Sequence, residues 1–578
     1  RRVPTAGCKK LKGPATTHTL WFRSQQIRVH FVAMSSATEQ TIDALVVGAG
    51  FGGVYQLKKL RDQGLKTKLI DAASDVGGTW YWNRYPGAMS DTASFMYRYS
   101  WDLEDLRTYP WSNSYVSQKE VQGYLRHVSE RHDLIKDMVF EAALESADWD
   151  EASSSWIVET SAGITFRTRY LVTALGILSK RNVPDIAGLS SFGGEKFHTA
   201  AWPENVALEG KRVGVIGNGS SGVQVVTAIA KDAKHKHLIS FQRNPQYSVP
   251  SGLRPVPSSE RQEINEKYPE IWKEAFEESA FAFGFKEASR KTFDVDEKER
   301  NRIYEEAWNK GGGFRFMFET FSDITTDEAA NNAAGDFIKA KIREKVKDPE
   351  KARKLMPSEF YARRPLCDTG FYEQFNRENV DIVNLKETPI ERITEKGILT
   401  SDGKEHELDV LIFATGFDSV DGSYTRLAIK GKEGTLKDYW SAEGPTSYLG
   451  VSVPSFPNLF MLGGPNGPFS NIPPALEVHA RFISDLIESA EAKRKAESAR
   501  APVIEATREA EKGWTDLCNQ VSAGSLFRKT ESWMFAANIP GKKRYIQFWL
   551  GGLSGFGKQL QDIAAQGWKG YSITPAAS

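Results

Sequence analysis

Two stretches of the chain share one pattern of hydrophobic and polar positions. Residues 42–47 (IDALVV) form an apolar run of strand length, a glycine-rich turn follows at once, and residues 54–60 then repeat apolar positions at helical spacing. Residues 212–216 (RVGVI), another glycine-rich turn and the apolar stretch 223–230 follow the same order. The pattern predicts two strand–turn–helix units and therefore an α/β protein.

A long helical stretch interrupts the alternation of strands and helices. A serine pair at 258–259 can cap a helix in which apolar residues recur at helical spacing between 264 and 276, with acids and lysines between them. Strands resume at 380–385 and at 410–413. We therefore expect a helical insertion over 258–365, inside the second strand–turn–helix unit.

The composition narrows the possible partners. The 578 residues carry 75 Lys plus Arg against 74 Asp plus Glu, a net charge of +1, which gives no argument for a nucleic-acid partner. The three cysteines have neither a CxxC nor a zinc-ligand spacing, so we expect no redox-active cysteine pair and no metal. The apolar runs are shorter than the roughly 18 residues that a membrane span needs. We expect a cytoplasmic protein without a transmembrane segment.

The start of the chain is basic. Residues 1–33 contain seven lysines or arginines and no acid. Such a leader can be a mitochondrial transit peptide, which would place the protein in mitochondria. The alternative, which we favour, is that the natural chain starts at Met34 and that everything before it is upstream sequence. Residues 1–39 are left out of the fold prediction for this reason.

The first glycine-rich turn has the spacing of a dinucleotide site. Gly48, Gly50 and Gly53 form GxGxxG, in which the first two glycines allow a tight turn and close approach of a pyrophosphate, and the third lets the helix pack on the strand. The helix N-terminus then faces the phosphates. A second predicted strand at 67–70 ends in Asp71, where an acid can bind ribose hydroxyls.

The second glycine-rich turn predicts a second dinucleotide site with its own preference. The strand after it, 237–242, ends in Arg243, and no carboxylate stands there. Arginine can pair with a 2′-phosphate, whereas an acid would repel it, so this site should prefer NADPH to NADH. The residues expected at the phosphates are Gly217, Gly219, Ser220, Ser221 and Gly222.

Two dinucleotide sites on one chain imply an electron donor and an acceptor. We expect FAD at the first site and NADPH at the second, because a flavin takes hydride from a nicotinamide. The fold class is then α/β, with two Rossmann-like dinucleotide-binding domains and a helical insertion. The lack of a cysteine pair excludes a disulfide reductase and leaves oxygen, a quinone-like dye or a protein as the acceptor.

Three further motifs point to one family. Residues 192–203 fit the pattern FxGxxxHxxxWP, residues 77–91 run from GGTW to Asp91, and residues 414–418 read ATGFD. Together they resemble type I Baeyer–Villiger monooxygenases, closest to the cyclohexanone monooxygenase branch, over about residues 40–560. The fingerprint positions are Phe192, Gly194, His198, Trp202 and Pro203.

The resemblance implies a reaction and its catalytic residues. Enzymes of this family use FAD and NADPH to insert one oxygen atom from dioxygen beside a ketone carbonyl, through a peroxyflavin, and so turn cyclic ketones into lactones and linear ketones into esters. A fixed cation must stabilise the peroxide anion in a poorly hydrated pocket. The matching residue is Arg364, and Asp91 matches the carboxylate that orients it. We expect a ketone and dioxygen as substrates and a monomeric enzyme.

The resemblance also implies cofactor and substrate residues. Arg363 aligns with the family's basic residue at the NADP phosphate, Trp533 with a mobile-loop tryptophan over the nicotinamide, and His198 with a residue that positions the domains. The GGTW motif adds Gly78, Thr79 and Trp80 to the cofactor site. Candidate walls of an apolar ketone pocket are Leu178, Phe283, Phe469, Ile472 and Phe548.

The predicted domains are discontinuous in sequence. The chain should begin the flavin domain, build the NADPH domain around the insertion, and then return to the flavin domain. The expected limits are 40–180 and 414–578 for the FAD-binding domain, 181–257 and 366–413 for the NADPH-binding domain, and 258–365 for the helical insertion.

Two other functions share parts of this pattern. A flavin-containing N- or S-monooxygenase shares both glycine turns, but such enzymes generally lack the Trp-Pro ending and the arginine, so Trp202, Pro203 and Arg364 argue against it. A non-catalytic NADP(H)-sensing protein would have lost its oxygenation residues, whereas Asp91 and Arg364 are both present.

Overall fold

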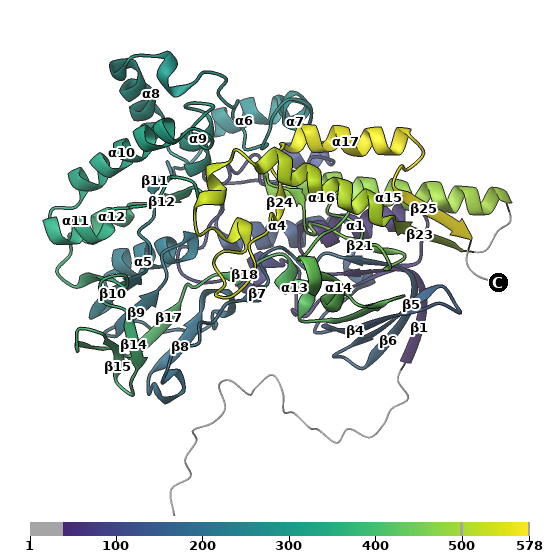
Figure 1. Ribbon diagram of the computed structural model, residues 1–578, viewed down its shortest axis with the longest axis horizontal. Helices are drawn as coiled ribbons and strands as arrows, with labels where there is room; N and C mark the ends of the chain where they lie inside the picture. The colour runs from purple at the N-terminus through teal and green to yellow at the C-terminus, as the bar shows by residue number, and fades with distance from the viewer. Residues whose placement is uncertain (1–37, 498–500, 576–578) are drawn as a thin grey trace, which may run out of the picture. The chain divides into compact units, whose positions relative to one another are not determined.

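Figure 1 shows the computed structural model, which describes residues 38–497 and 501–575. The predicted basic leader lies outside these residues. Within them, no helix combines the length and the hydropathy that crossing a bilayer requires. Two β-sheets and the helices around them form most of the described chain.

The first sheet has nine strands and draws on two distant parts of the chain. The paired order is β20 (Gly434–Thr435), β19 (Ala428–Gly431), β4 (Leu144–Asp150), β5 (Ser155–Thr160), β6 (Ile164–Thr173), β1 (Thr38–Val47), β2 (Thr67–Ile70) and β3 (Met138–Val139), and β21 (Leu459–Met461) pairs with β6. β1 and β2 are parallel, with Val47 beside Ile70, so the glycine turn and Asp71 begin at the same edge of the sheet.

The second sheet has five strands and is parallel throughout. Its order is β13 (Val380–Asn384), β10 (His237–Gln242), β9 (Arg212–Ile216), β17 (Val410–Phe413) and β8 (Glu195–His198). Every residue of β17 is buried, as expected of a parallel strand covered on both faces. α5 (Ser220–Asp232) follows β9 as α1 (Phe51–Asp62) follows β1. These features confirm the predicted α/β class with two Rossmann-type sheets.

Two segments carry the chain from the first sheet to the second and back, and they pair with each other. β7 (Lys180–Arg181) lies on the outgoing segment and β18 (Phe417–Asp418) on the returning one, and the two strands are antiparallel. The returning segment contains the ATGFD motif. The limits of the domains themselves stay a prediction.

The predicted insertion is helical, but its first helix is broken. The sequence predicts one helix through residues 258–276, whereas the structure has α6 (Ser258–Glu266) and α7 (Tyr268–Glu277). Pro269 stands in the first turn of α7, where a missing N–H is tolerated, and it could not continue a helix from α6. Pro257 precedes α6, and no side chain caps that helix, so the prediction of a serine cap was wrong.

The remaining elements surround these two sheets. The other helices are α2 (Thr79–Trp82), α3 (Leu103–Thr108), α4 (Gln118–Arg131), α8 (Glu297–Lys310), α9 (Gly313–Phe318), α10 (Glu328–Lys345), α11 (Pro349–Leu355), α12 (Phe371–Gln374), α13 (Asp421–Thr425), α14 (Leu436–Glu443), α15 (Ile472–Glu497), α16 (Arg508–Ser522) and α17 (Leu553–Ala565). The other strands are β11 (Ser248–Pro250), β12 (Leu366–Asp368), β14 (Ile390–Ile393), β15 (Gly397–Thr400), β16 (Glu405–Glu407), β22 (Gly467–Pro468), β23 (Pro502–Ala506), β24 (Phe548–Trp549) and β25 (Tyr571–Pro575). β11 and β12 pair in parallel and close the insertion.

Candidate active site

The first glycine turn leaves a bare backbone at the end of β1. Gly48 has φ +112°, and a Cβ there would overlap the carbonyl oxygen of Ala174, while a Cβ on Gly53 would overlap the carbonyl oxygen of Gly48. Gly50 faces the GGTW motif, where a Cβ on Gly78 would lie 2.9 Å from its Cα. The tight backbone and the free N–H groups at the start of α1 fit the pyrophosphate of FAD.

Asp71 lies at the end of β2, beside this turn. One carboxylate oxygen accepts the N–H of Ala49 at 2.5 Å and the other accepts the N–H of Ala73 at 2.7 Å. Burial raises the pKa of Asp71, and these two bonds oppose it. A carboxylate has about four lone pairs, so Asp71 keeps acceptors for ribose hydroxyls. Thr79 and Trp80 open α2, directly after the GGTW glycines.

The second glycine turn repeats this geometry at the end of β9. A Cβ on Gly217 would overlap the backbone of the ATGFD motif, and a Cβ on Gly222 would overlap the carbonyl oxygen of Gly217, whereas Gly219 has open space around it. Ser220 and Ser221 open α5, so their N–H groups belong to the first helical turn. This turn offers N–H groups to the pyrophosphate of NADPH.

Arg364 connects the segment after the GGTW motif with the second glycine turn. Its guanidinium binds both carboxylate oxygens of Asp91, one of them at 2.8 Å, and donates to the hydroxyl of Ser220 at 3.0 Å. Asp91 follows the GGTW motif and Ser220 opens α5, so the structure brings three predicted site residues together. Burial works against the charge of Arg364, but Asp91 outweighs it and the pKa of the guanidinium is raised.

The segment that carries Asp91 packs directly on α5. The hydroxyl of Tyr85 donates to the side chain of Gln224 at 2.8 Å, and a Cβ on Gly87 would lie 2.8 Å from the carbonyl oxygen of Gln224. Burial raises the pKa of Tyr85 to about 12, so its hydroxyl keeps its proton. This packing fixes the distance between the flavin motif and the NADPH turn.

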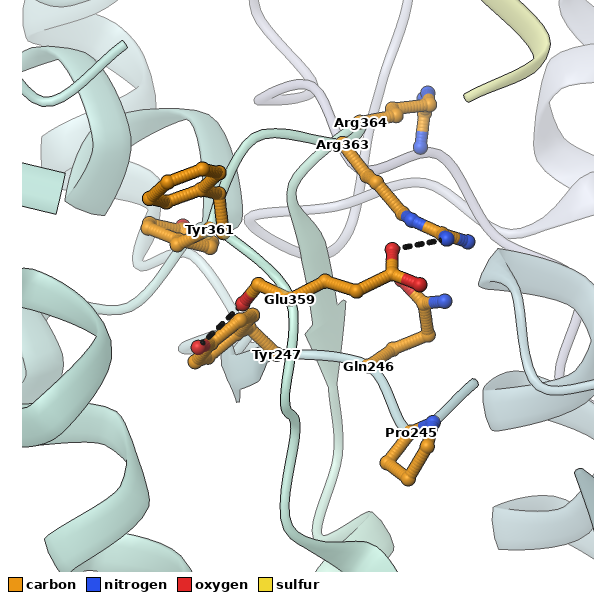
Figure 2. Close-up of a pocket in the computed structure, with 8 residues that line it drawn as sticks. Pro245, Gln246, Tyr247, Glu359, Tyr361, Arg363 and Arg364 are labelled. Carbon is orange, nitrogen blue, oxygen red and sulfur yellow. Dashed lines mark hydrogen bonds and ion pairs between the residues drawn. The ribbon is translucent and has the colours of Figure 1, made fainter. Parts of the chain in front are cut away.

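The two arginines expected at the NADPH phosphate each pair with a carboxylate. Arg243 lies 3.4 Å from Glu531, and Arg363 binds Glu359. Figure 2 shows Arg363 pointing to Glu359 at a small pocket that residues 245–247, 359–361, 363 and 364 line. A phosphate can replace such carboxylates at an arginine. Neither Glu359 nor Glu531 could be predicted as a site residue, because both stand outside every motif.

Aromatic rings from distant segments form one cluster. Phe283 stacks on Phe314 with ring centroids 3.9 Å apart, Phe314 lies 6.5 Å from Phe469, and Phe469 lies 6.0 Å from Phe548. Trp533 meets Phe548 edge to face at 5.6 Å. Three predicted pocket residues and the predicted loop tryptophan are therefore neighbours.

Two predicted pocket residues are only half-buried, and one residue beside the pocket was not predicted. Leu178 and Ile472 are half-buried, and their place in the pocket stays a prediction. Phe314 is absent from the predicted site although it contacts Phe283 and Phe469. The signal that could have found it is the run of three glycines before it, Gly311 to Gly313, which marks a close backbone approach.

The fingerprint residues mainly support the second sheet. Phe192 belongs to the hydrophobic core beside this sheet, and a Cβ on Gly194 would lie 2.7 Å from the Phe192 ring. Trp202 is buried against Phe197 with ring centroids 5.6 Å apart, and Pro203 follows it at the surface. Among the described residues, the hydrogen bonds of Arg364 and its cation–π contact involve none of these four predicted residues.

His198 has the position of a structural residue. It ends β8, its Nδ1 accepts the N–H of Ala200 at 3.1 Å, and its ring lies edge-on to Phe417 of the returning segment. Burial, with a smaller contribution from Arg181, lowers the pKa of His198 to about 4. The imidazole is therefore neutral at pH 7, which suits a positioning role between the two sheets.

Comparisons with known proteins agree with this geometry. Residues 42–246 match a family model described as flavin-binding monooxygenase-like. The chain is 49% identical over 533 residues to a cyclohexanone 1,2-monooxygenase from Acinetobacter sp, covering 92% of this chain and 96% of that protein. It is 48% identical over 533 residues to a phenazine N-monooxygenase from Lysobacter antibioticus, covering 92% and 97%. A crystal structure of cyclohexanone monooxygenase from Rhodococcus sp. Phi1 bound to NADP⁺ has a TM-score of 0.90 and 50% identity, over 94% of this chain and 100% of that one.

Proposed function

This chain belongs to the Baeyer–Villiger monooxygenases, and within that family we propose that Arg364, clamped by Asp91, is the cation on which ketone oxygenation depends. The protein is an FAD- and NADPH-dependent monooxygenase that inserts one oxygen atom beside a ketone carbonyl. The proposal adds dioxygen as the oxygen donor and a monomer as the active form. The role of Arg364 rests on its two hydrogen bonds to the carboxylate of Asp91 and the third to the hydroxyl of Ser220.

The residues around Arg364 suit the stabilisation of negative charge. FAD, when bound, takes a hydride from NADPH and activates dioxygen. Oxygen transfer to a carbonyl develops negative charge, which a fixed cation in a partly buried site stabilises without proton transfer. Three of the five N–H groups of Arg364 bind Asp91 and Ser220. The other two N–H groups have no hydrogen-bond partner among the described residues and can serve a ligand.

The coenzyme and the substrate have separate supports. We assign the 2′-phosphate of NADPH to Arg243 and Arg363, where it would take the place of Glu531 and Glu359. We assign the ketone to the apolar side of Arg364, where Phe283, Phe314 and Phe469 gather. A ketone needs apolar walls and a single donor for its one acceptor, which matches this arrangement.

A second candidate is N-oxidation of an aromatic heterocycle. It is favoured by one relative, the phenazine N-monooxygenase from Lysobacter antibioticus at 48% identity. Because the match to that relative covers nearly the whole chain, attack on an aromatic nitrogen is a candidate activity beside attack on a carbonyl. The stacked phenylalanines could also hold a flat heterocycle.

Isotope labelling with two substrate classes tests these candidates. FAD-loaded protein is mixed with NADPH and ¹⁸O₂, with a panel of cyclic and linear ketones in one set and phenazines in another, and the products are identified by mass spectrometry. One ¹⁸O atom in a lactone or ester supports ketone oxygenation, and one ¹⁸O atom in an N-oxide alone supports the second candidate. NADPH oxidation that yields only hydrogen peroxide with every substrate would contradict both.

A further inference from the structure

The guanidinium of Arg364 lies over the ring of Phe314. The Cζ of Arg364 lies 5.2 Å from the centroid of the Phe314 ring, within the range of a cation–π contact. Phe314 is 5% exposed, so the ring itself is shielded from water. No sequence motif assigned a function to Phe314, and the hydrogen bonds of Arg364 do not involve it.

The glycines before Phe314 explain why this ring reaches Arg364. Gly311 and Gly312 have φ values of +80° and +100°, which favour glycine. A Cβ on Gly313 would lie 2.7 Å from the carbonyl oxygen of Leu366. The first turn of α9 therefore rests on the backbone just after Arg364, and the next side chain, Phe314, meets the guanidinium.

The Phe314 ring is itself held in place. Phe283 stacks on it at 3.9 Å with an angle of 16° between the ring planes, and Phe469 lies 6.5 Å away at 57°. Stacked, close-packed rings have little freedom to rotate. The ring is thus a fixed platform and not a side chain that adapts to its neighbour.

We propose that Phe314 is a positioning residue for Arg364. The hydrogen bonds to Asp91 and Ser220 all come from Nη1 and Nη2, on one edge of the guanidinium, and a planar group held at one edge can still tilt about that edge. A rigid ring under the guanidinium limits this tilt and keeps the remaining N–H groups aimed at one place. The inference rests on the proposed function in one respect, that Arg364 supplies the working cation.

Chemical labelling of Arg364 tests the contact without any catalysis. The Arg364 side chain is 26% exposed, so a small reagent can reach it. FAD-loaded protein without NADPH is treated with phenylglyoxal, and the modified Arg364 peptide is followed by mass spectrometry over time. We expect Phe314→Leu to speed this labelling by about 2- to 30-fold, the range that follows from a cation–π contact. Labelling of Arg243 in the same digest should not change.

Three further variants separate the contact from general packing. Phe314→Tyr keeps the ring face and should label like the wild type. Phe283→Leu keeps the contact but removes the ring that holds Phe314 in place, so its labelling should be faster than that of the wild type and clearly slower than that of Phe314→Leu. A fluorinated phenylalanine at 314 has nearly the same shape with a weaker negative face, so labelling should rise with the number of fluorines even if Phe314→Leu folds poorly.

Peroxide release then connects the contact with the chemistry. Hydrogen peroxide formed per NADPH oxidised, at saturating ketone, should rise in Phe314→Leu and stay low in Phe314→Tyr. Unchanged labelling in Phe314→Leu and in the fluorinated proteins overturns this inference, and so does an equal rise in Phe283→Leu. Faster labelling with unchanged peroxide and product would support the contact and overturn the role proposed for Arg364.

Discussion

Position 364 makes demands that arginine meets better than any other side chain. It must keep a positive charge in a partly buried site, donate two parallel hydrogen bonds to the carboxylate of Asp91, and lie over the ring of Phe314. The guanidinium is planar, always charged and carries five N–H groups, whereas lysine offers one compact ammonium. The family motifs predicted Arg364 and Asp91 from the sequence. They could not predict Phe314 or Glu531, because these contacts arise only when distant segments pack.

Replacing Arg364 should separate coenzyme oxidation from product formation. In Arg364→Ala, NADPH oxidation should continue while ester or lactone formation falls by about 100- to 1000-fold, as when one charge-stabilising donor is removed. Product formation in Arg364→Lys should lie between that of the wild type and that of Arg364→Ala, since lysine keeps the charge but cannot make both hydrogen bonds to Asp91. Gas chromatography of products and a peroxide assay measure both. Product at wild-type levels from Arg364→Ala would remove this residue from the reaction.

At the scale of elements, limits are predictable where local signals are strong. β2, β9, β10 and β17 have the limits that the sequence predicts, because glycines and polar residues bound each apolar run. The break between α6 and α7 was missed because the apolar spacing continues through it, and Pro269 alone interrupts the backbone. The segment after α16 is a different case, since its contacts with Arg243 and Phe548 depend on tertiary packing.

Neutralising Glu531 should strengthen the binding of NADPH. Glu531 pairs with Arg243 and accepts the amide of Asn244 at 3.3 Å, so the 2′-phosphate has to displace it. Both partners are about half exposed, and such a pair is worth about 0.2 to 1 kcal/mol. The KM for NADPH in Glu531→Gln should therefore fall by about 1.5- to 5-fold, with little change for NADH.

Two other variants complete that test. Glu328→Gln breaks an ion pair with Lys529, which lies in the same segment as Glu531, and should leave the KM for NADPH unchanged. Arg243→Ala should raise the KM for NADPH far more than that for NADH, by about 10-fold or more for a charge-assisted bond. A rise in the KM for NADPH in Glu531→Gln would show that this carboxylate helps the coenzyme and does not compete with it.

Gly313 should tolerate no side chain. In Gly313→Ala the new Cβ would press on the carbonyl oxygen of Leu366, so α9 must shift away from the Arg364 backbone at a cost of about 1 to 3 kcal/mol. Gly513→Ala is the matched control, because Gly513 lies in α16 with open space around it, and alanine there should stabilise slightly. Thermal unfolding compares the two. A Gly313→Ala protein as stable as Gly513→Ala would contradict the close packing of α9.

At the scale of the molecule, each sheet is built from separate stretches of sequence. The first sheet takes strands before residue 174 and after residue 427, and the second takes strands between them. The motifs predicted this exchange, because ATGFD marks the return of the chain. Two buried histidines pack against aromatic rings of other segments: His198 is beside Phe417 of the returning segment, and His479 of α15 lies edge-on to Phe556 of α17.

These two histidines should make the fold sensitive to mild acid. Burial is the main cause that lowers the pKa of each to about 4, and the hydrogen bond from His479 to the Leu449 carbonyl opposes the shift only in part. Between pH 6.5 and pH 4 the unfolded chain binds more protons at these sites than the folded chain, so stability falls as pH falls. Each histidine can cost up to about 3 kcal/mol across this window.

Melting temperatures between pH 7.5 and pH 5 measure this effect. His198→Asn and His479→Asn should each lose less stability on acidification than the wild type, whatever their stability at pH 7.5. His237→Asn is the control, because His237 is a third exposed and pairs with Asp381 at the edge of the second sheet. Slopes equal to that of the wild type in both test variants would mean that other groups cause the acid sensitivity.

Because three separate segments hold Arg364 in place, recombination of related genes can separate the residues that contact it. Asp91, Ser220 and Phe314 reach the guanidinium from a flavin motif, a helix of the second sheet and the insertion. A hybrid gene that joins two parents between these positions takes some of the residues that hold Arg364 from one parent and the rest from the other. Such a hybrid can fold and consume NADPH yet waste it as peroxide. In a gene-shuffling library, positions 91, 220, 314 and 364 should therefore all come from the same parent.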